Sequence, residues 1–222
     1  MADEISRMAA KILIETKALL FRPEDPFVFT SGRISPVYVD CRRLISFPRA
    51  RAALMTMAVQ RLSAEVGLEA FDVIAGGETA GIPFAAWLAE RYSLPMVYVR
   101  KKPKGFGRNA QIEGTFEDGD RFLLVEDLAT DGGSKLRFAE AIREAGGEVS
   151  HAFVVFLYGI FPQAIAELEA KGLKLHALCT WWDALAAVEE AGYLPAEGVA
   201  EVRAFLNDPD GWSAARGGKD AG

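Results

Sequence analysis

The chain has 222 residues, half of them hydrophobic, and its formal net charge is −6. This length and apolar content suit one globular domain with a sizeable core. The acidic balance excludes the broad positive surface that draws proteins to nucleic acids or anionic membranes. No apolar run approaches the length that spans a membrane.

The N-terminal sequence and the cysteines indicate a compartment. The first ten residues include acidic side chains and no long apolar run, which argues against a signal peptide. The two cysteines, Cys41 and Cys179, lie in apolar stretches and do not form a CxxC pair. We therefore expect buried thiols in a reducing compartment and a cytoplasmic protein.

The first predicted elements are a helix and a small flap. Apolar side chains recur at helical spacing over residues 3–20, and Asp3 can cap the start of this helix. Two short apolar runs, 27–29 and 37–39, flank the polar segment TSGRIS and predict an antiparallel flap, or hood.

From residue 48 the pattern becomes an alternation of helices and short apolar strands. A helix is expected from Pro48 to Val66, because proline suits a first helical turn and Gly67 suits a C-terminal stop. The strand-like runs are 71–76, 95–100, 121–126, 152–158 and 173–179, and helix-like segments lie between most of them at 82–92, 134–146 and 161–172. This alternation predicts an α/β fold with a mostly parallel, doubly wound sheet covered on both faces.

We interpret residues 1–222 as one domain. It comprises an N-terminal helix and flap (1–45), an α/β core (46–180) and a helical C-terminal segment (181–222). Ligands of such folds bind at the carboxyl ends of the strands, so the residues directly after each strand are the candidates for chemistry.

The strongest local pattern begins at the strand-like run near residue 122. Four apolar residues, Phe122–Val125, predict a buried strand, and Glu126 and Asp127 follow at its end. Two adjacent carboxylates at this place can accept hydrogen bonds from the hydroxyl groups of a ribose.

A short loop with two glycines follows the acidic pair and leads into a helix predicted to start near Lys135. A helix start offers backbone N–H groups without internal partners, and glycines let the backbone approach a phosphate closely. Thr130 and Ser134 add hydroxyl donors. The loop is therefore suited to bind one phosphate monoester.

A second pattern is the basic segment 100–108, which holds five cations and no acid. Runs of this kind are usually solvated surface charge or a nucleic-acid patch. Here the run follows a strand and contains two glycines and a proline. We therefore predict a mobile ligand-binding loop.

The acidic pair and its loop resemble the signature of the type I phosphoribosyltransferases, which is an apolar strand, two acids, an apolar residue and a Thr-x-Gly-Gly-type loop. The resemblance implies that the acids contact the ribose hydroxyls of 5-phosphoribosyl-1-pyrophosphate (PRPP) and that the loop holds its 5′-phosphate. The PRPP-binding residues implied here are Glu126, Asp127, Leu128, Ala129, Thr130, Asp131, Gly132, Gly133 and Ser134.

The basic loop resembles that of orotate phosphoribosyltransferases. By this likeness Arg100, Lys101 and Lys104 contact the pyrophosphate, and the loop closes over the active site of a neighbouring subunit. A homodimer with shared active sites is therefore expected. Lys104, Lys101 and Asp127 are the implied catalytic residues, and Mg²⁺ on the ribose and pyrophosphate oxygens is the implied cofactor.

Other stretches are also similar to orotate phosphoribosyltransferases: the flap at 29–42, the loops at 77–83 and 111–114, and the C-terminal tail. The implied reaction transfers ribose 5-phosphate from PRPP to orotate. The implied orotate-binding residues are Thr130, Ser31, Gly32 and Tyr38.

Three positions depart from that family's pattern. Many members have Lys where Thr30 stands, His where Phe106 stands, and Arg near the strand that here ends in 156–159. Two alternatives therefore stay open, a phosphoribosyltransferase acting on a purine base and a PRPP-sensing regulator. A regulator that binds nucleic acid should carry an added basic segment, which this acidic chain lacks.

Overall fold

The computed structural model describes residues 3–105, 111–130 and 132–219. It divides into two compact units, one formed by residues 1–47 with 179–222 and the other by residues 48–178. Among the helices of these described ranges, none is both long and apolar enough to span a bilayer.

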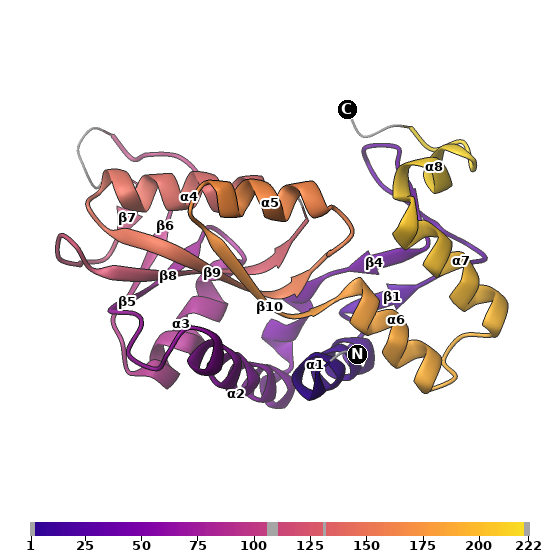
Figure 1. Cartoon of the computed structure of the whole chain (residues 1–222), viewed down its shortest axis with the longest axis horizontal. Coiled ribbons are helices and arrows are strands. Elements are labelled where there is room, and N and C mark those ends of the chain that lie inside the picture. Colours follow the sequence, from indigo (N-terminus) through magenta and orange to yellow (C-terminus); the bar gives the residue numbers. More distant parts are fainter. Residues whose placement is uncertain (1–2, 106–110, 131, 220–222) are drawn as a thin grey trace. The chain divides into compact units, whose positions relative to one another are not determined.

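The unit of residues 48–178 is built on a six-stranded sheet (Figure 1). Its strands are β5 (Val73–Gly77), β6 (Met96–Val99), β7 (Ile112–Glu113), β8 (Arg121–Ala129), β9 (Glu148–Leu157) and β10 (Lys174–Thr180), in the spatial order β10-β9-β8-β5-β6-β7. β5 pairs in parallel with β6 and β8, and β8 pairs in parallel with β9. The short β7 is antiparallel to its neighbour β6. The predicted mostly parallel sheet is confirmed.

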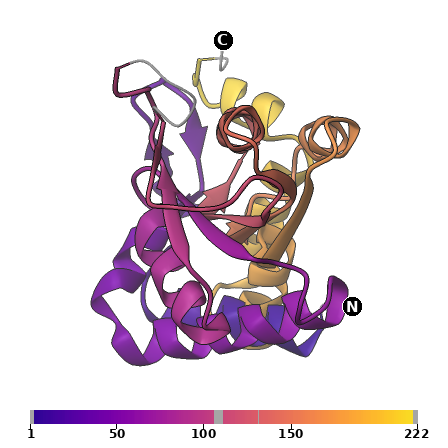
Figure 2. The ribbon, with the colours of Figure 1, turned by 90° about the vertical axis from the view of Figure 1, so that its left-hand side faces the viewer.

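Helices cover both faces of this sheet. They are α2 (Pro48–Glu65), α3 (Gly81–Tyr92), α4 (Gly133–Glu144) and α5 (Pro162–Ala170). Figure 1 shows α4 and α5 on one face and α2 and α3 on the other, and Figure 2 shows this layering from the side. The doubly wound arrangement therefore follows from the alternation of strands and helices along the chain.

The core of this unit lies between the strands and the helices. Phe122 to Val125 in the middle of β8 are at most 1% exposed, as expected for a strand buried on both faces. On the α4 face, Phe138 and Ile142 pack into a cluster with side chains of the strands. Burial of this cluster fixes the position of the strand ends that carry the polar motifs.

The other unit combines helices with two antiparallel strand pairs. Its elements are α1 (Glu4–Glu15), β1 (Leu19–Phe21), β2 (Phe27–Val28), β3 (Ile34–Ser35), β4 (Val37–Val39), the 3₁₀ helix η1 (Cys41–Ser46), α6 (Trp181–Glu190), α7 (Ala196–Asn207) and α8 (Pro209–Ala214). Asp3 caps α1 as predicted, because its carboxylate accepts a hydrogen bond from the Ser6 N–H at 2.8 Å. A capping box between Thr180 and Asp183 starts α6.

The predicted pairing within the flap is wrong. β4 pairs with β1, so Val37–Val39 lies beside Leu19–Phe21, whereas Phe27 and Val28 pair with β3. The predicted helix over 3–20 is also too long. α1 ends at Glu15, because Leu19–Phe21 pairs with β4 as strand β1. Sequence spacing alone does not determine which of several short strands will pair.

Candidate ribose-phosphate site

The acidic pair lies inside a strand and not after it. β8 continues through Glu126 and Asp127 to Ala129, because its last residues still pair with β9. Both acidic residues are buried, at 8% exposure each. The following helix starts at Gly133, two residues before the predicted position, so Ser134 belongs to its first turn.

The two carboxylates leave the strand on opposite faces, because successive strand residues alternate. Glu126 lies on the face that α4 covers, where it contacts Ser134 and Lys135. Asp127 therefore points to the other face, and its Oδ1 accepts a hydrogen bond from the Leu128 N–H at 2.9 Å.

Lys135 is a site residue that the sequence motif did not identify. Its Nζ forms an ion pair with Glu126 Oε2 at 2.6 Å and donates hydrogen bonds to Leu128 O at 2.5 Å and Ser134 Oγ at 3.1 Å. The spacing of nine residues between Glu126 and Lys135 gives no local sequence signal. The turn from β8 into α4 brings the two together.

Burial raises the pKa of Asp127 above its ordinary value, and the negative charge of Glu126 raises it further. The Leu128 N–H and the Lys135 ammonium act in the opposite direction. Lys135 is therefore the cation that opposes the rise in the pKa of Asp127.

The loop between β8 and α4 has the backbone conformation that its glycines permit. Gly132 has a φ of +79°, and a side chain there would approach Leu168 to 2.8 Å. Thr130 is half-buried at the start of the loop. Asp131, which the sequence predicts as a PRPP-binding residue, lies outside the described residues.

The end of β5 packs closely against the end of β8. A Cβ on Gly77 would lie 2.8 Å from Glu126 Oε1 and 2.7 Å from Phe138. A Cβ on Gly81, the first residue of α3, would lie 2.3 Å from Val125 O. Two glycines in the loop at 77–83 thus let this loop lie directly beside the acidic pair.

The base of the basic loop is anchored to its neighbours. The Arg100 N–H donates to Gln111 O at 2.8 Å, and the Gln111 side chain donates back to Arg100 O at 2.7 Å. The Lys101 N–H donates to Glu78 Oε2 at 2.7 Å, which joins this base to the loop after β5. Arg100 Nη1 also contacts Glu113 Oε1 at 3.3 Å.

Lys101 and Lys104 are both exposed. Residues 106–110, which include the departure at Phe106, lie outside the described residues. The structure therefore brings the loop after β5 together with the base of the basic loop and the end of β8, which are two of the segments predicted to bind PRPP.

The residues predicted to bind the base belong mainly to the other unit. Gly32 has a φ of +88° in the flap turn, and Ser31 Oγ accepts a hydrogen bond from the Arg33 N–H at 3.4 Å. The ring of Tyr38 packs against Phe27 at 5.4 Å between centroids. Their role toward a base stays a prediction.

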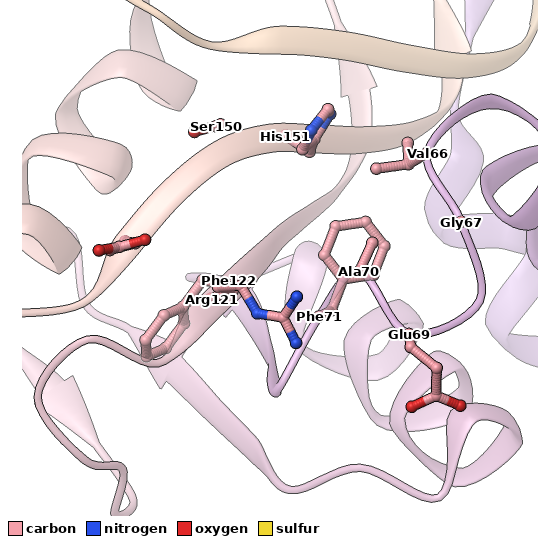
Figure 3. A pocket seen from close by; sticks show the side chains of 10 residues that line it. Val66, Gly67, Glu69, Ala70, Phe71, Arg121, Phe122, Ser150 and His151 are labelled. Carbon is pink, nitrogen blue, oxygen red and sulfur yellow. The ribbon is translucent and has the colours of Figure 1, made fainter.

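A separate hollow lies at the amino ends of β5, β8 and β9 (Figure 3). It has a volume of about 490 Å³ and includes Arg121 and His151 in its lining. His151 Nδ1 lies 3.0 Å from His176 Nε2, and His176 Nδ1 lies 2.5 Å from Glu65 Oε2. Both ring nitrogens of the buried His176 are thus satisfied, which suits a structural role.

Known proteins are similar to this chain over most of its length. A family model of the phosphoribosyl transferase domain matches residues 50–170. An orotate phosphoribosyltransferase of Cereibacter sphaeroides is 57% identical over 214 residues, which cover 96% of this chain and 92% of that relative. The chain belongs to the orotate phosphoribosyltransferase family.

Two solved structures extend the likeness to the fold. Orotate phosphoribosyltransferase from Aeropyrum pernix is 32% identical with a TM-score of 0.70, and the match covers 85% of this chain and 100% of that one. UMP synthase from Leishmania donovani is 28% identical with a TM-score of 0.74, over 90% of this chain and 42% of that one. The predicted fold class is confirmed.

The range matched by the phosphoribosyl transferase domain model includes all three strand-end segments described above. The flap residues Ser31, Gly32 and Tyr38 lie before it.

Proposed function

We propose that this chain transfers ribose 5-phosphate from PRPP to orotate, producing orotidine 5′-phosphate and pyrophosphate for pyrimidine nucleotide synthesis. The observation that carries the proposal is the acidic pair and helix start of β8 and α4 in a chain 57% identical to a named orotate phosphoribosyltransferase. The names of the relatives favour orotate over a purine base and over a regulatory role.

The donor site is proposed at the ends of β8 and β5. The start of α4 would bind the 5′-phosphate, because backbone N–H groups and the positive end of the helix dipole face an anion there. Ser134 and Thr130 would add hydroxyl donors. Asp127 and Glu126 would accept hydrogen bonds from the ribose hydroxyls and so orient the sugar.

The reaction breaks the bond between ribose C1 and the pyrophosphate oxygen, and the pyrophosphate leaves with the electron pair. A ring nitrogen of orotate forms the new bond to C1 and gives up its proton, which the departing pyrophosphate can accept. Negative charge grows on the leaving group while positive charge grows on the ribose ring. Lys101 and Lys104 would stabilise the leaving group, with Arg100 at the base of the same loop.

Closure of the basic loop would exclude water, which otherwise competes with orotate for the ribosyl cation. The contact between Lys101 N and Glu78 Oε2 supports this proposal, because it anchors one side of the loop beside the loop after β5. With Thr30 and Phe106 where many family members have Lys and His, the remaining cations would carry more of the pyrophosphate charge.

Magnesium is proposed to enter with PRPP, held by the ribose and pyrophosphate oxygens. Within residues 3–105, 111–130 and 132–219, no group of three or more His, Cys, Asp or Glu could hold a metal ion by itself. Mg²⁺ commonly relies on substrate phosphates for several of its ligands. When bound, it would neutralise part of the charge that develops on pyrophosphate.

Orotate is proposed to be bound by the flap residues Ser31, Gly32 and Tyr38 and by Thr130, the residues that the family likeness implies. Contacts with the C-terminal tail support a fixed flap, since the Ile34 N–H donates to Ser213 Oγ at 2.9 Å and the Lys219 N–H donates to Gly32 O at 3.0 Å. We also propose that the enzyme is cytoplasmic.

A homodimer with shared active sites is proposed from the family likeness of the basic loop. Subunits that carry Lys104→Ala and subunits that carry Asp127→Ala should both be inactive alone. After exchange of subunits, a mixture should recover part of the activity, because one hybrid site holds both wild-type residues. Hybrids that form and remain inactive would rule out a loop that acts across the interface.

The test of the proposed reaction is the loss of orotate ultraviolet absorbance when the chain, Mg²⁺ and PRPP are mixed. Loss that requires all components is the expected result. PRPP binding measured by calorimetry without any loss of orotate would leave the donor site intact and redirect the search to other bases.

A further inference from the structure

The charged residues buried in this chain gather at one place. Among the described residues, the Asp, Glu, Lys and Arg side chains that are buried are those of Glu126, Asp127 and Lys135, at 8%, 8% and 5% exposure. Buried charges are costly unless they are paired and hydrogen-bonded. These three side chains, which lie together beside the loop between β8 and α4, must therefore pair with one another or form hydrogen bonds.

Lys135 has no spare donor with which to contact a ligand. An ammonium has three N–H donors, and three acceptors surround Lys135 Nζ: Glu126 Oε2, Leu128 O and Ser134 Oγ, at 2.6, 2.5 and 3.1 Å. Contact with PRPP would break one of these interactions. Lys135 is therefore suited to position other groups.

Ser134 shares the same carboxylate oxygen. Its hydroxyl donates to Glu126 Oε2 at 3.0 Å while its oxygen accepts from Lys135. A serine hydroxyl has only one proton to donate. The hydroxyl must therefore turn away from Glu126 if it is to donate to a phosphate, and Glu126 then needs another partner.

We infer that Lys135 is a positioning residue for PRPP: it holds and neutralises Glu126, so that the Ser134 hydroxyl is released from this carboxylate to the 5′-phosphate of the donor. The inference rests on the proposed function in so far as PRPP is the ligand. It adds a buried cation to the proposed site. With this cation, Glu126 keeps a partner when the Ser134 hydroxyl donates to the phosphate.

This role has a consequence for pH dependence. The charged groups that act on Asp127 are Glu126 and Lys135, and Lys135 is the one that lowers its pKa. Without Lys135, Asp127 should take up a proton at a higher pH. The PRPP affinity of Lys135→Met should consequently fall, on acidification, at a higher pH than that of the wild type.

The primary measurement is the Kd for PRPP by calorimetry, which requires no choice of base. We expect Lys135→Met to raise this Kd by about 10- to 100-fold, the range for losing a hydrogen bond to a charged group. Lys171→Met is the matched control, because it removes the same charge from an exposed position in the same unit. It should leave the Kd unchanged.

A double variant tests whether Lys135 acts through Glu126. In Glu126→Gln the carboxylate charge is absent, so adding Lys135→Met should cost little further affinity. Losses that multiply in the double variant, or a wild-type Kd and pH profile for Lys135→Met, would overturn the inference. If Lys135→Met alone does not fold, the double variant should fold, because Glu126→Gln removes the buried carboxylate charge that the loss of Lys135 leaves without its cation.

The same experiment separates this inference from the proposed reaction. A wild-type chain that binds PRPP and does not consume orotate would overturn orotate as the substrate. The inference about Lys135 would still be tested by the Kd for PRPP of Lys135→Met. A wild-type chain that does not bind PRPP would overturn both.

Discussion

Gly81→Ala is expected to destabilise the α/β unit, because Gly81 allows α3 to approach β8 closely. A Cβ at this position would lie 2.3 Å from the backbone oxygen of Val125, and real contacts of a Cβ are essentially never shorter than 3.0 Å. The two groups must therefore separate by about 0.7 Å, the difference between these distances. The φ of Gly81 is not in the left-handed region, so the effect is steric.

The α3 helix cannot move away freely. It also packs against β5, where a Cβ on Gly76 would lie 2.9 Å from the Cα of Ile82. Phe84 and Leu88 of the same helix are fully buried. Overpacking of such an interface costs about 1–3 kcal/mol, and the backbone partner at Gly81 suggests the upper part of this range.

The assay is denaturant unfolding followed by PRPP calorimetry on the folded variant. Gly198→Ala in α7 is the control, since its nearest contact would be a side-chain atom of Pro23 at 3.2 Å. Alanine in a helix interior gains up to about 1 kcal/mol over glycine, so the control should change stability by no more than about that amount. A Gly81→Ala variant as stable as the control would refute the close approach of α3 to β8.

Two further predictions concern surface charge. Lys104→Ala should lower turnover, measured by steady-state kinetics, by about 10²–10³-fold, the loss typical of one donor to transition-state charge. Lys102→Ala is the control: it removes a neighbouring positive charge and should not cause a loss of this size. Asp72 has its pKa lowered to about 2 by hydrogen bonds from Arg121, so its contribution to stability is complete above about pH 4 and is lost as the pH falls toward 2. Asp72→Asn should therefore lower the Tm by about 1–3 °C at pH 7, the size expected for losing an exposed ion pair. If the Tm difference between variant and wild type persisted unchanged near pH 2, the lowered pKa of Asp72 would be contradicted.

The α/β core follows from the periodicity of the amino-acid sequence. Strand and helix periods alternate from Pro48 onward, and a parallel sheet covered by helices is the arrangement that buries both kinds of apolar pattern. The acidic pair and the glycine loop predict a ribose-phosphate site from the sequence because the signal is local: it depends on a strand end, a helix start and residues adjacent in the chain.

Contacts between residues that are distant in the chain could not be predicted from the sequence. The pairing of Val37–Val39 with Leu19–Phe21 is a choice among short strands of similar character, and sequence spacing does not rank them. The extension of β8 through Glu126 and Asp127 depends on pairing with β9 and on the buried ammonium of Lys135. No local propensity predicts a carboxylate pair inside a strand, because the partner that stabilises it is placed there only when the chain folds.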